Sequence, residues 1–240
     1  MSLDQRKGRY ASEIITHWDS NRVVVVGGMV YDKNGHEPTK TSRQLFETDS
    51  KYTRHYWRES SKLKHPRAFF CLVEKDGGAL AIGGLSKGKT GNVVLNSVEL
   101  FGEKNSNLSS MKTPRSGHRC ARLPIGNLSI LVTGGTEGFG QSALASGEFF
   151  DVERNIWTPV RSMNVARFGH AVVTVGERVF ALGGDDRRNN NFDTIEEFNI
   201  KEGSWKIIPQ KLKKPRSNFG YTLIPHSLFD GCRIEKPLIE

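Results

Sequence analysis

Residues 166–184 read ARFGHAVVTVGERVFALGG, and this stretch decides the fold. It holds two short apolar runs, His170 to Val175 and Arg178 to Leu182, separated only by Gly176-Glu177. Apolar, β-branched runs joined by such a tight turn predict a β-hairpin. Gly183-Gly184 ends the second run, where glycine permits backbone angles that are closed to other residues.

The same pattern occurs four times along the 240 residues, and each copy ends in a glycine pair. The second glycines of successive pairs lie 56, 51 and 49 residues apart. A fixed period of about 50 residues is the signature of a repeat architecture. The pairs are Gly27-Gly28, Gly83-Gly84, Gly134-Gly135 and Gly183-Gly184.

Other residue types recur at nearly constant distances from the glycine pairs. An arginine lies 17 to 20 residues before each second glycine, and a phenylalanine lies 14 to 18 residues after it. A tryptophan follows in three of the four units, whereas the second unit has Leu108 there. The arginines are Arg9, Arg67, Arg115 and Arg167, with Arg216 opening a fifth unit; the tryptophans are Trp57, Trp157 and Trp205.

Each unit reads as four short strands. In the fourth unit, Thr194 to Ile200 and Ser204 to Ile208 are the expected third and fourth strands, and no segment shows the sustained period of a long helix. A four-stranded sheet alone buries too little surface, so such sheets stack around an axis as a β-propeller. We expect the repeated Phe and Trp side chains to fill the space between neighbouring sheets.

The complete third unit resembles the kelch motif. Its characteristic residues are Pro114-Arg115-Ser116-Gly117-His118, Gly134-Gly135, Glu148, Phe150, Trp157 and Met163. The resemblance covers about residues 6–225, with departures at Leu108 and at the polar insertion 32–42 of the first unit. It implies an all-β, kelch-type β-propeller of four-stranded antiparallel blades.

We therefore expect a single kelch propeller domain over residues 6–240, with four complete blades plus a partial fifth. The expected blades are 6–63, 64–112, 113–163 and 164–212, followed by the partial blade 213–240. Kelch propellers have five to seven blades, so the count predicts an incomplete ring. An open ring exposes a blade face and unpaired strand edges.

The repeated arginines are the candidate partner-binding residues. By the kelch resemblance they precede the innermost strand of each blade and gather near one mouth of the central channel, where guanidinium groups suit carboxylate or phosphate. A second interpretation stays open, because Glu99, Glu148 and Glu196 recur two residues before the blade Phe, with Gln44 in the first unit. Arginine and glutamate would then neutralise each other inside the scaffold.

Composition narrows the classes of partner. The chain carries 35 basic and 26 acidic residues, a net charge of +9, which favours an acidic partner. The charges are not organised with aromatic residues into a recognisable nucleic-acid module, which argues against that partner. No run is apolar long enough to span a bilayer, and the start has no signal peptide, so we expect a cytoplasmic protein with no membrane partner. Three cysteines, Cys71, Cys120 and Cys232, predict reduced thiols.

The pattern of residues favours a non-enzymatic protein-interaction module in an adaptor or scaffold role. Phosphate-loop, zinc-ligand and nucleophile-turn motifs are missing, and we expect no cofactor, no metal and no catalytic residues. Because His118 and His170 hold equivalent places in their units, we expect them to be structural. The resemblance implies a protein partner, such as an acidic peptide segment, an actin-associated protein or a ubiquitin-ligase component. The alternative is a propeller enzyme, such as a sugar epimerase or oxidase, with a non-repeated cluster of ionisable residues at one channel mouth.

Overall fold

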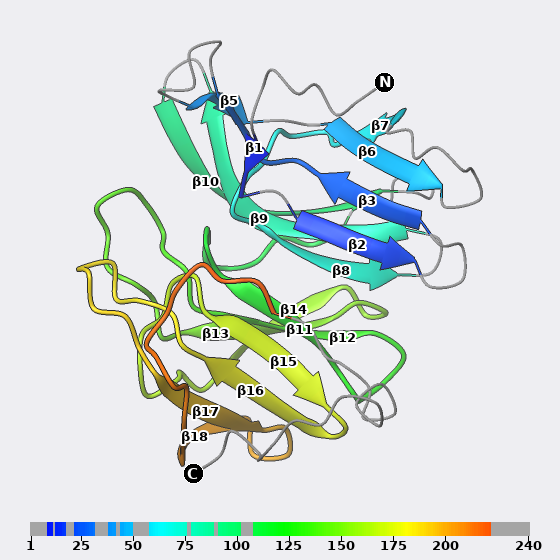
Figure 1. Cartoon of the computed structure of the whole chain (residues 1–240). Coiled ribbons are helices and arrows are strands. Elements are labelled where there is room, and N and C mark those ends of the chain that lie inside the picture. Colours follow the sequence, from blue (N-terminus) through cyan, green and yellow to red (C-terminus); the bar gives the residue numbers. More distant parts are fainter. Residues whose placement is uncertain are drawn as a thin grey trace, which may run out of the picture.

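The computed structural model describes residues 9–11, 13–17, 22–31, 38–41, 44–49, 58–75, 78–88, 91–101 and 108–221. Within these ranges all regular structure is β-strand and no helix occurs. The strands form separate antiparallel sheets that follow one another along the chain and fan out as blades (Figure 1). This arrangement confirms the all-β propeller predicted from the repeats.

The third and fourth blades are four-stranded meanders whose spatial order follows the chain order. In both, the first two strands form the predicted hairpin and the glycine pair ends the second strand. The third blade consists of β11 (Arg119–Leu123), β12 (Ser129–Thr133), β13 (Gly147–Asp151) and β14 (Ile156–Val160); the fourth consists of β15 (Ala171–Val175), β16 (Arg178–Leu182), β17 (Thr194–Asn199) and β18 (Ser204–Lys211).

The first two blades depart from this plan. In the second blade, β9 and β10 continue beyond Gly83-Gly84 as a tall hairpin, which pairs Leu85 with Val94. A small sheet of the first repeat, in the order β1-β4-β5, lies against it. The first blade is β2 (Glu13–His17), β3 (Arg22–Val26), β6 (Gln44–Asp49) and β7 (Arg58–Lys62); the second is β8 (Cys71–Lys75), β9 (Gly78–Gly88) and β10 (Gly91–Phe101); the small sheet is β1 (Arg9–Tyr10), β4 (Met29–Tyr31) and β5 (Pro38–Thr41).

Consecutive repeats are joined by the same backbone hydrogen bond. The N–H of each second glycine donates to the carbonyl of the next repeat's arginine, over 2.7 to 2.9 Å. The fourth of these bonds runs from Gly184 to Arg216, so the start of the fifth repeat docks on the fourth blade in the register of the others. The four bonds are Gly28 to Arg67, Gly84 to Arg115, Gly135 to Arg167 and Gly184 to Arg216.

A second series of hydrogen bonds runs around the axis, two residues beyond each arginine. From the second repeat on, the N–H of the residue at this position donates to the carbonyl of its counterpart in the preceding repeat, over 2.7 to 3.2 Å. All five residues have φ between 52° and 64°, a left-handed conformation that costs a bulky residue energy. We call this series the axial ring: Ala11, Phe69, Gly117, Gly169 and Asn218.

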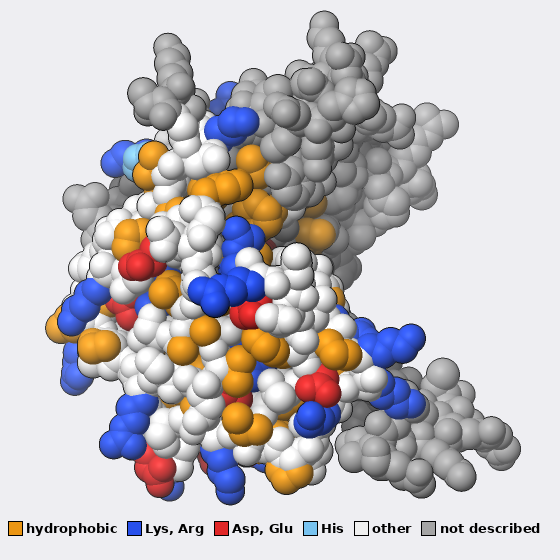
Figure 2. Space-filling view, turned by 90° about the vertical axis from the view of Figure 1, so that its left-hand side faces the viewer, with side chains coloured by type: hydrophobic (Ala, Val, Ile, Leu, Met, Phe, Trp, Pro, Cys, Tyr) orange, Lys and Arg blue, Asp and Glu red, His pale blue; other side chains and the backbone are white. Residues whose placement is uncertain are grey.

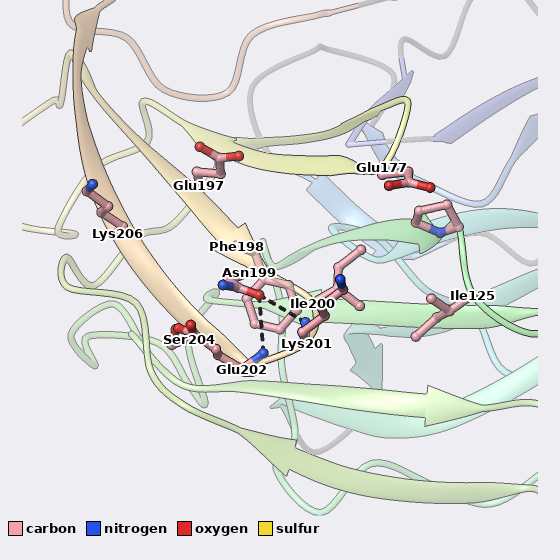
Figure 3. A pocket seen from close by; sticks show the side chains of 11 residues that line it. Ile125, Glu177, Glu197, Phe198, Asn199, Ile200, Lys201, Glu202, Ser204 and Lys206 are labelled. Carbon is pink, nitrogen blue, oxygen red and sulfur yellow. Dashed lines mark hydrogen bonds between the residues drawn. The ribbon is translucent and has the colours of Figure 1, made fainter.

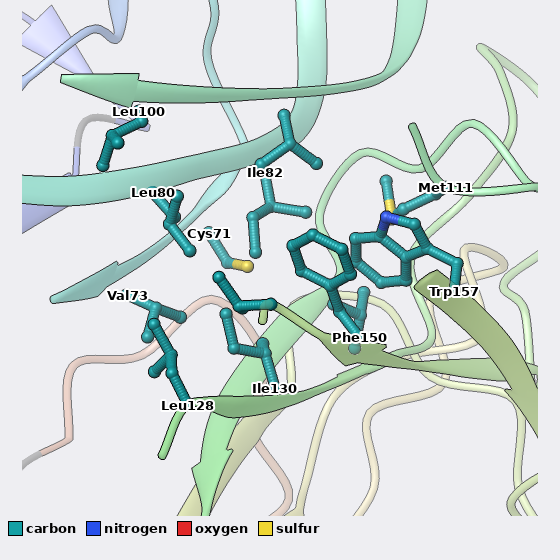
Figure 4. Packing of buried hydrophobic residues seen from close by; sticks show 13 residues of the cluster. Cys71, Val73, Leu80, Ile82, Leu100, Met111, Leu128, Ile130, Phe150 and Trp157 are labelled. Atoms are coloured by element: carbon teal, nitrogen blue, oxygen red, sulfur yellow. The ribbon is translucent and has the colours of Figure 1, made fainter. Parts of the chain in front are cut away.

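Apolar side chains from facing sheets fill the space between blades. Figure 4 shows the largest cluster, in which Leu80 and Ile82 of the second blade face Ile130 and Phe150 of the third. Trp157 stacks on Phe150 with ring centroids 4.4 Å apart, and its indole N–H donates to the carbonyl of Ser109. Trp205 packs on Phe198 in the next cluster, whereas Trp57 lies outside the described residues.

Cys71 and Cys120 form a disulfide, which corrects the prediction of reduced thiols for these two residues. The spacing of 49 residues is one repeat, so the two cysteines fall on the first strands of neighbouring blades, β8 and β11. Stacking of the blades brings their Cα atoms to 6.0 Å. Cys232 lies outside the part of the chain that the structure describes.

We expect the Cys71–Cys120 bond to stabilise the propeller by about 2–4 kcal/mol, because it closes a long loop in the unfolded chain. The measurement is the urea midpoint with and without a phosphine reductant. The midpoint should fall on reduction, and the Cys71→Ser/Cys120→Ser variant should show the lower midpoint under both conditions. If the urea midpoint of the wild-type protein is the same with and without the reductant, the expectation is contradicted.

Candidate partner-binding surface

The guanidinium group of Arg167 is completely buried within its own blade. It donates to the carbonyl of Gly183 at 2.6 Å and to the carbonyl and hydroxyl of Thr194 at 3.1 and 2.8 Å. It also pairs with the carboxylate of Glu196 at 3.1 Å, and that carboxylate is fully buried too. The arginine thus binds the end of β16 to the start of β17.

Arg115 and Arg67 repeat this arrangement. Arg115 donates to the carbonyl of Gly134 and to Ser146, each at 3.0 Å, and pairs with Glu148 at 3.4 Å. Each arginine therefore binds the first glycine of its pair, a hydroxyl residue, and the glutamate two residues further on. For Arg67 these partners are Gly83, Ser97 and Glu99.

These contacts determine the role of the three arginines. Arg67, Arg115 and Arg167 are at most 1% exposed, and burial lowers the pKa of each guanidinium while its glutamate opposes the change. Their Nη donors face carbonyl, hydroxyl and carboxylate oxygens of the same blade, and because the whole side chains are buried a partner at the surface would not reach them. Of the two interpretations of the repeated arginines, internal pairing describes these three.

The two remaining arginines differ from these three. Arg216 is exposed, and its Nε–H donates to the carbonyl of Lys214 at 3.3 Å. The backbone of Arg9 lies in β1, but its side chain is outside the described part of the structure. Arg216 is thus the one candidate arginine, among those whose side chains are described, that a partner could contact directly.

His118 and His170 are buried against the first glycines of the preceding repeats. Phe70 and Phe219 occupy the same place in their repeats, which fits a structural role for this position. Burial lowers the pKa of His118 to about 3 and that of His170 well below its usual value, and nearby arginines add to both shifts. The Nδ1 atoms of both rings have no hydrogen-bond partner among the described residues.

Glu13 and Arg119 form an ion pair that the repeats do not predict. The two side chains come from the first strands of the first and third blades and approach to 4.0 Å. Burial raises the pKa of Glu13, which Arg119 partly offsets, although 31% of the side chain stays exposed. Sequence reasoning missed this pair because the equivalent positions of the second and fourth repeats hold Cys71 and Ala171.

The loops that follow the glycine pairs differ between repeats and emerge at the end of the blades that carries the axial ring. The third blade presents Phe139, whose side chain is 71% exposed, and the fourth presents Arg187 and Arg188. The tall hairpin of the second blade presents Val93, which is 53% exposed. Figure 2 shows that hydrophobic and cationic side chains lie side by side on one face of the molecule.

A pocket of about 600 Å³ lies at the opposite end, between the third and fourth blades (Figure 3). Ile125 and Ile200 line it together with the carboxylates of Glu177 and Glu202 and the ammonium of Lys206. Asn199 shapes the adjoining turn by accepting the N–H groups of Lys201 and Glu202. The lining of the pocket contains both acidic and basic side chains, so the pocket favours no single class of ligand.

The described residues lack two further kinds of feature. They contain no group of three or more His, Cys, Asp or Glu side chains placed to hold a metal ion. They also contain no helix long and apolar enough to cross a membrane.

The fold and its repeated contacts define a β-propeller of kelch type. The family model for the kelch motif matches residues 166–211, which contain the four strands of the fourth blade. Human Kelch-like protein 34 is 25% identical over 211 residues, which cover 82% of this chain and 32% of that protein. Mouse Kelch-like protein 38 is 33% identical over 85 residues, which cover 35% of this chain and 14% of that protein. The predicted resemblance to the kelch-repeat family is thereby confirmed, and the chain spans about a third or less of the length of these relatives.

A solved structure supports the same fold. The structure of YjhT superposes with a TM-score of 0.66 at 16% sequence identity. The match covers 86% of this chain and 67% of YjhT, so about a third of that propeller has no counterpart here. At this identity the likeness concerns the fold alone.

Proposed function

We propose that this chain is a non-enzymatic protein-interaction module that presents the loops at one end of the propeller to an acidic protein partner. The proposal rests on one contrast: the contacts inside the blades repeat, whereas the loops at this end of the propeller do not. The interior repeats one set of contacts around Arg67, Arg115 and Arg167, whereas the loops after the glycine pairs differ and expose Phe139, Arg187 and Arg188. Exposed aromatic and arginine side chains are the types that dominate protein interfaces.

The kelch-like relatives support a protein-interaction propeller, and the proposal extends this to an adaptor or scaffold role. An acidic partner fits the net charge of +9, since opposite charge speeds and orients association. The resemblance extends the proposal to cytoplasmic partners such as actin-associated proteins or ubiquitin-ligase components.

Site-specific photocrosslinking tests the proposal. A benzophenone amino acid replaces Phe139 at the loop end in one variant and Ile156 in another, where Ile156 is 53% exposed at the opposite end of the third blade. We expect a discrete protein to crosslink at position 139 and not at 156, and unlabelled protein to compete for it. The same weak background at both positions would rule the proposal out.

A further inference from the structure

The outer face of the fourth blade, which carries Val175 and Phe180, is less covered than the equivalent faces of the other blades. In the first three blades the middle residue of the second strand is at most 5% exposed, because side chains of the next blade pack on it. Phe180 holds this position in the fourth blade and is only partly buried. Val175 is 49% exposed, whereas its third-blade counterpart Leu123 is 3% exposed. The three covered residues are Val24, Leu80 and Leu131.

A two-pronged ion pair lies on this outer face. Glu197, directly opposite Phe180 in the β16–β17 ladder, accepts the Nε–H and an Nη–H of Arg178 at 2.7 and 2.9 Å. The guanidinium carbon of Arg178 lies 4.8 Å from the ring centroid of Phe180, a geometry that favours a cation over an aromatic face. The ion pair therefore covers the aromatic ring that a neighbouring blade covers elsewhere.

The sequence places a charge at the position of Glu197 in the fourth repeat alone. The residue just before the blade phenylalanine is apolar in the other three repeats, where Leu45, Leu100 and Phe149 hold this position. A further blade packed on the fourth would bury the Arg178–Glu197 pair, and the loss of hydration opposes such burial. A polar outer face is the property that the terminal unit of a repeat protein needs.

Contacts near the axis join repeats that are not neighbours. Glu13 of the first blade lies 4.0 Å from Arg119 of the third, and the rings of Phe69 and Phe168, from the second and fourth repeats, have centroids 6.3 Å apart. Each contact bypasses the repeat that lies between its two partners in the chain. Both contacts therefore oppose an outward movement of the blades that contacts between neighbours alone would permit.

The start of the fifth repeat reaches the same pair. Burial raises the pKa of Tyr221, and the charges of Arg119 and Glu13 act on it in opposite directions. Because a charge shifts a pKa mainly at short range, the hydroxyl of Tyr221 lies near the pair that the first and third blades form. The first, third and fifth repeats therefore meet at the axis.

We propose that the four blades and the start of the fifth repeat close on themselves without a fifth full blade. Glu13 and Arg119 hold the ring together across the axis, and the Arg178–Glu197 pair caps the outer face of the fourth blade. The cap prevents association through this face, which an exposed apolar sheet would promote. Closure and capping are independent of what the loops bind, so they go beyond the proposed function.

The test gives the fourth blade the two residues that the third blade has at these positions, Ser129 and Phe149, in the variant Arg178→Ser/Glu197→Phe. We expect a monomeric wild type and a variant whose molar mass by light scattering is about twice as large, because the variant exposes a continuous apolar face. The matched control is Glu153→Phe/Arg154→Ser, which makes the same exchanges on the exposed turn between β13 and β14. It should remain monomeric.

A variant that remains monomeric, a control that associates equally, or a dimeric wild type would overturn the cap. Glu197→Leu, which introduces the residue type of the second repeat, replaces the double variant if circular dichroism shows that the latter does not fold.

A second measurement tests the contact across the axis. Glu13→Arg and Arg119→Glu should each lower the urea midpoint, because each places like charges side by side. The Glu13→Arg/Arg119→Glu variant restores an opposite pair and should recover most of the loss. A double variant as unstable as the sum of the two single variants would overturn the closure of the ring by this pair.

Discussion

Replacing Glu196 by glutamine is expected to lower the free energy of unfolding by about 3–5 kcal/mol, because it leaves the charge of Arg167 buried without a counter-charge. The two side chains are fully buried and 3.1 Å apart. The carboxylate also accepts the backbone N–H groups of Asn164 and Val165 at 2.7 and 3.0 Å. A glutamine amide nitrogen would face one of these donors, so hydrogen bonding is lost together with the charge.

The neighbouring residue provides the control for this prediction. Glu197 pairs with Arg178 on the surface of the same strand, where solvent screens the pair, so Glu197→Gln should leave the urea midpoint nearly unchanged. The Arg167→Met/Glu196→Gln double variant should recover part of the loss, because replacing both charges removes the isolated guanidinium. Urea titrations followed by tryptophan fluorescence measure all three. Equal effects of the Glu196 and Glu197 substitutions would refute a scaffold role for the buried pair.

The role of the buried arginines could not be predicted from the sequence alone. The repeat of Arg67, Arg115 and Arg167 with glutamates at a matching place predicted both internal pairing and a ring of ligand contacts. Periodicity cannot decide between them, since a repeated residue repeats equally at a mouth and in an interior. The hydroxyl residue two positions before each glutamate was the missing signal. Each arginine binds that residue as well as the carboxylate and the carbonyl of the first glycine, so its partners all belong to its own blade.

Features that occur in single repeats were not predictable in this way. The hairpin of β9 and β10 extends past Gly83-Gly84 to Gly88 and Gly91, whereas in the other repeats the second strand ends at the glycine pair. The Cys71–Cys120 bond depends on the distance between neighbouring blades, which no local pattern contains. The stacking of Arg187 on Phe168 likewise depends on the return of the chain after the fourth glycine pair. Sequence therefore predicted the repeated fold, and the structure was needed for the individual contacts that distinguish the blades.

Stability is expected to fall steeply in acid because two buried histidines stay neutral in the folded protein. The pKa of His118 is about 3 when folded, against about 6.5 in an unfolded chain, and that of His170 is lowered in the same direction. At a pH between these two values, the histidine is protonated in the unfolded chain and neutral in the folded chain. Each histidine should therefore lower the free energy of unfolding by about 1.4 kcal/mol per unit of decreasing pH, beginning near pH 6.5.

The internal repeats suggest the variant that tests this. Phe70 and Phe219 occupy the equivalent position, so His118→Phe/His170→Phe should fold and show a flatter dependence of the urea midpoint on pH between about 6.5 and 4. Each single variant should remove about half of the change. Burial would raise the pKa of Glu99, but Arg67 and the N–H groups of Lys64 and His65 outweigh it and lower that pKa. Glu99 therefore adds a further loss of stability below about pH 4.5, which the histidine substitutions do not change. An unchanged slope in the double variant would show that other groups control unfolding in acid. A flatter slope would mean that the two positions where the repeat replaces Phe by His make the propeller sensitive to acid.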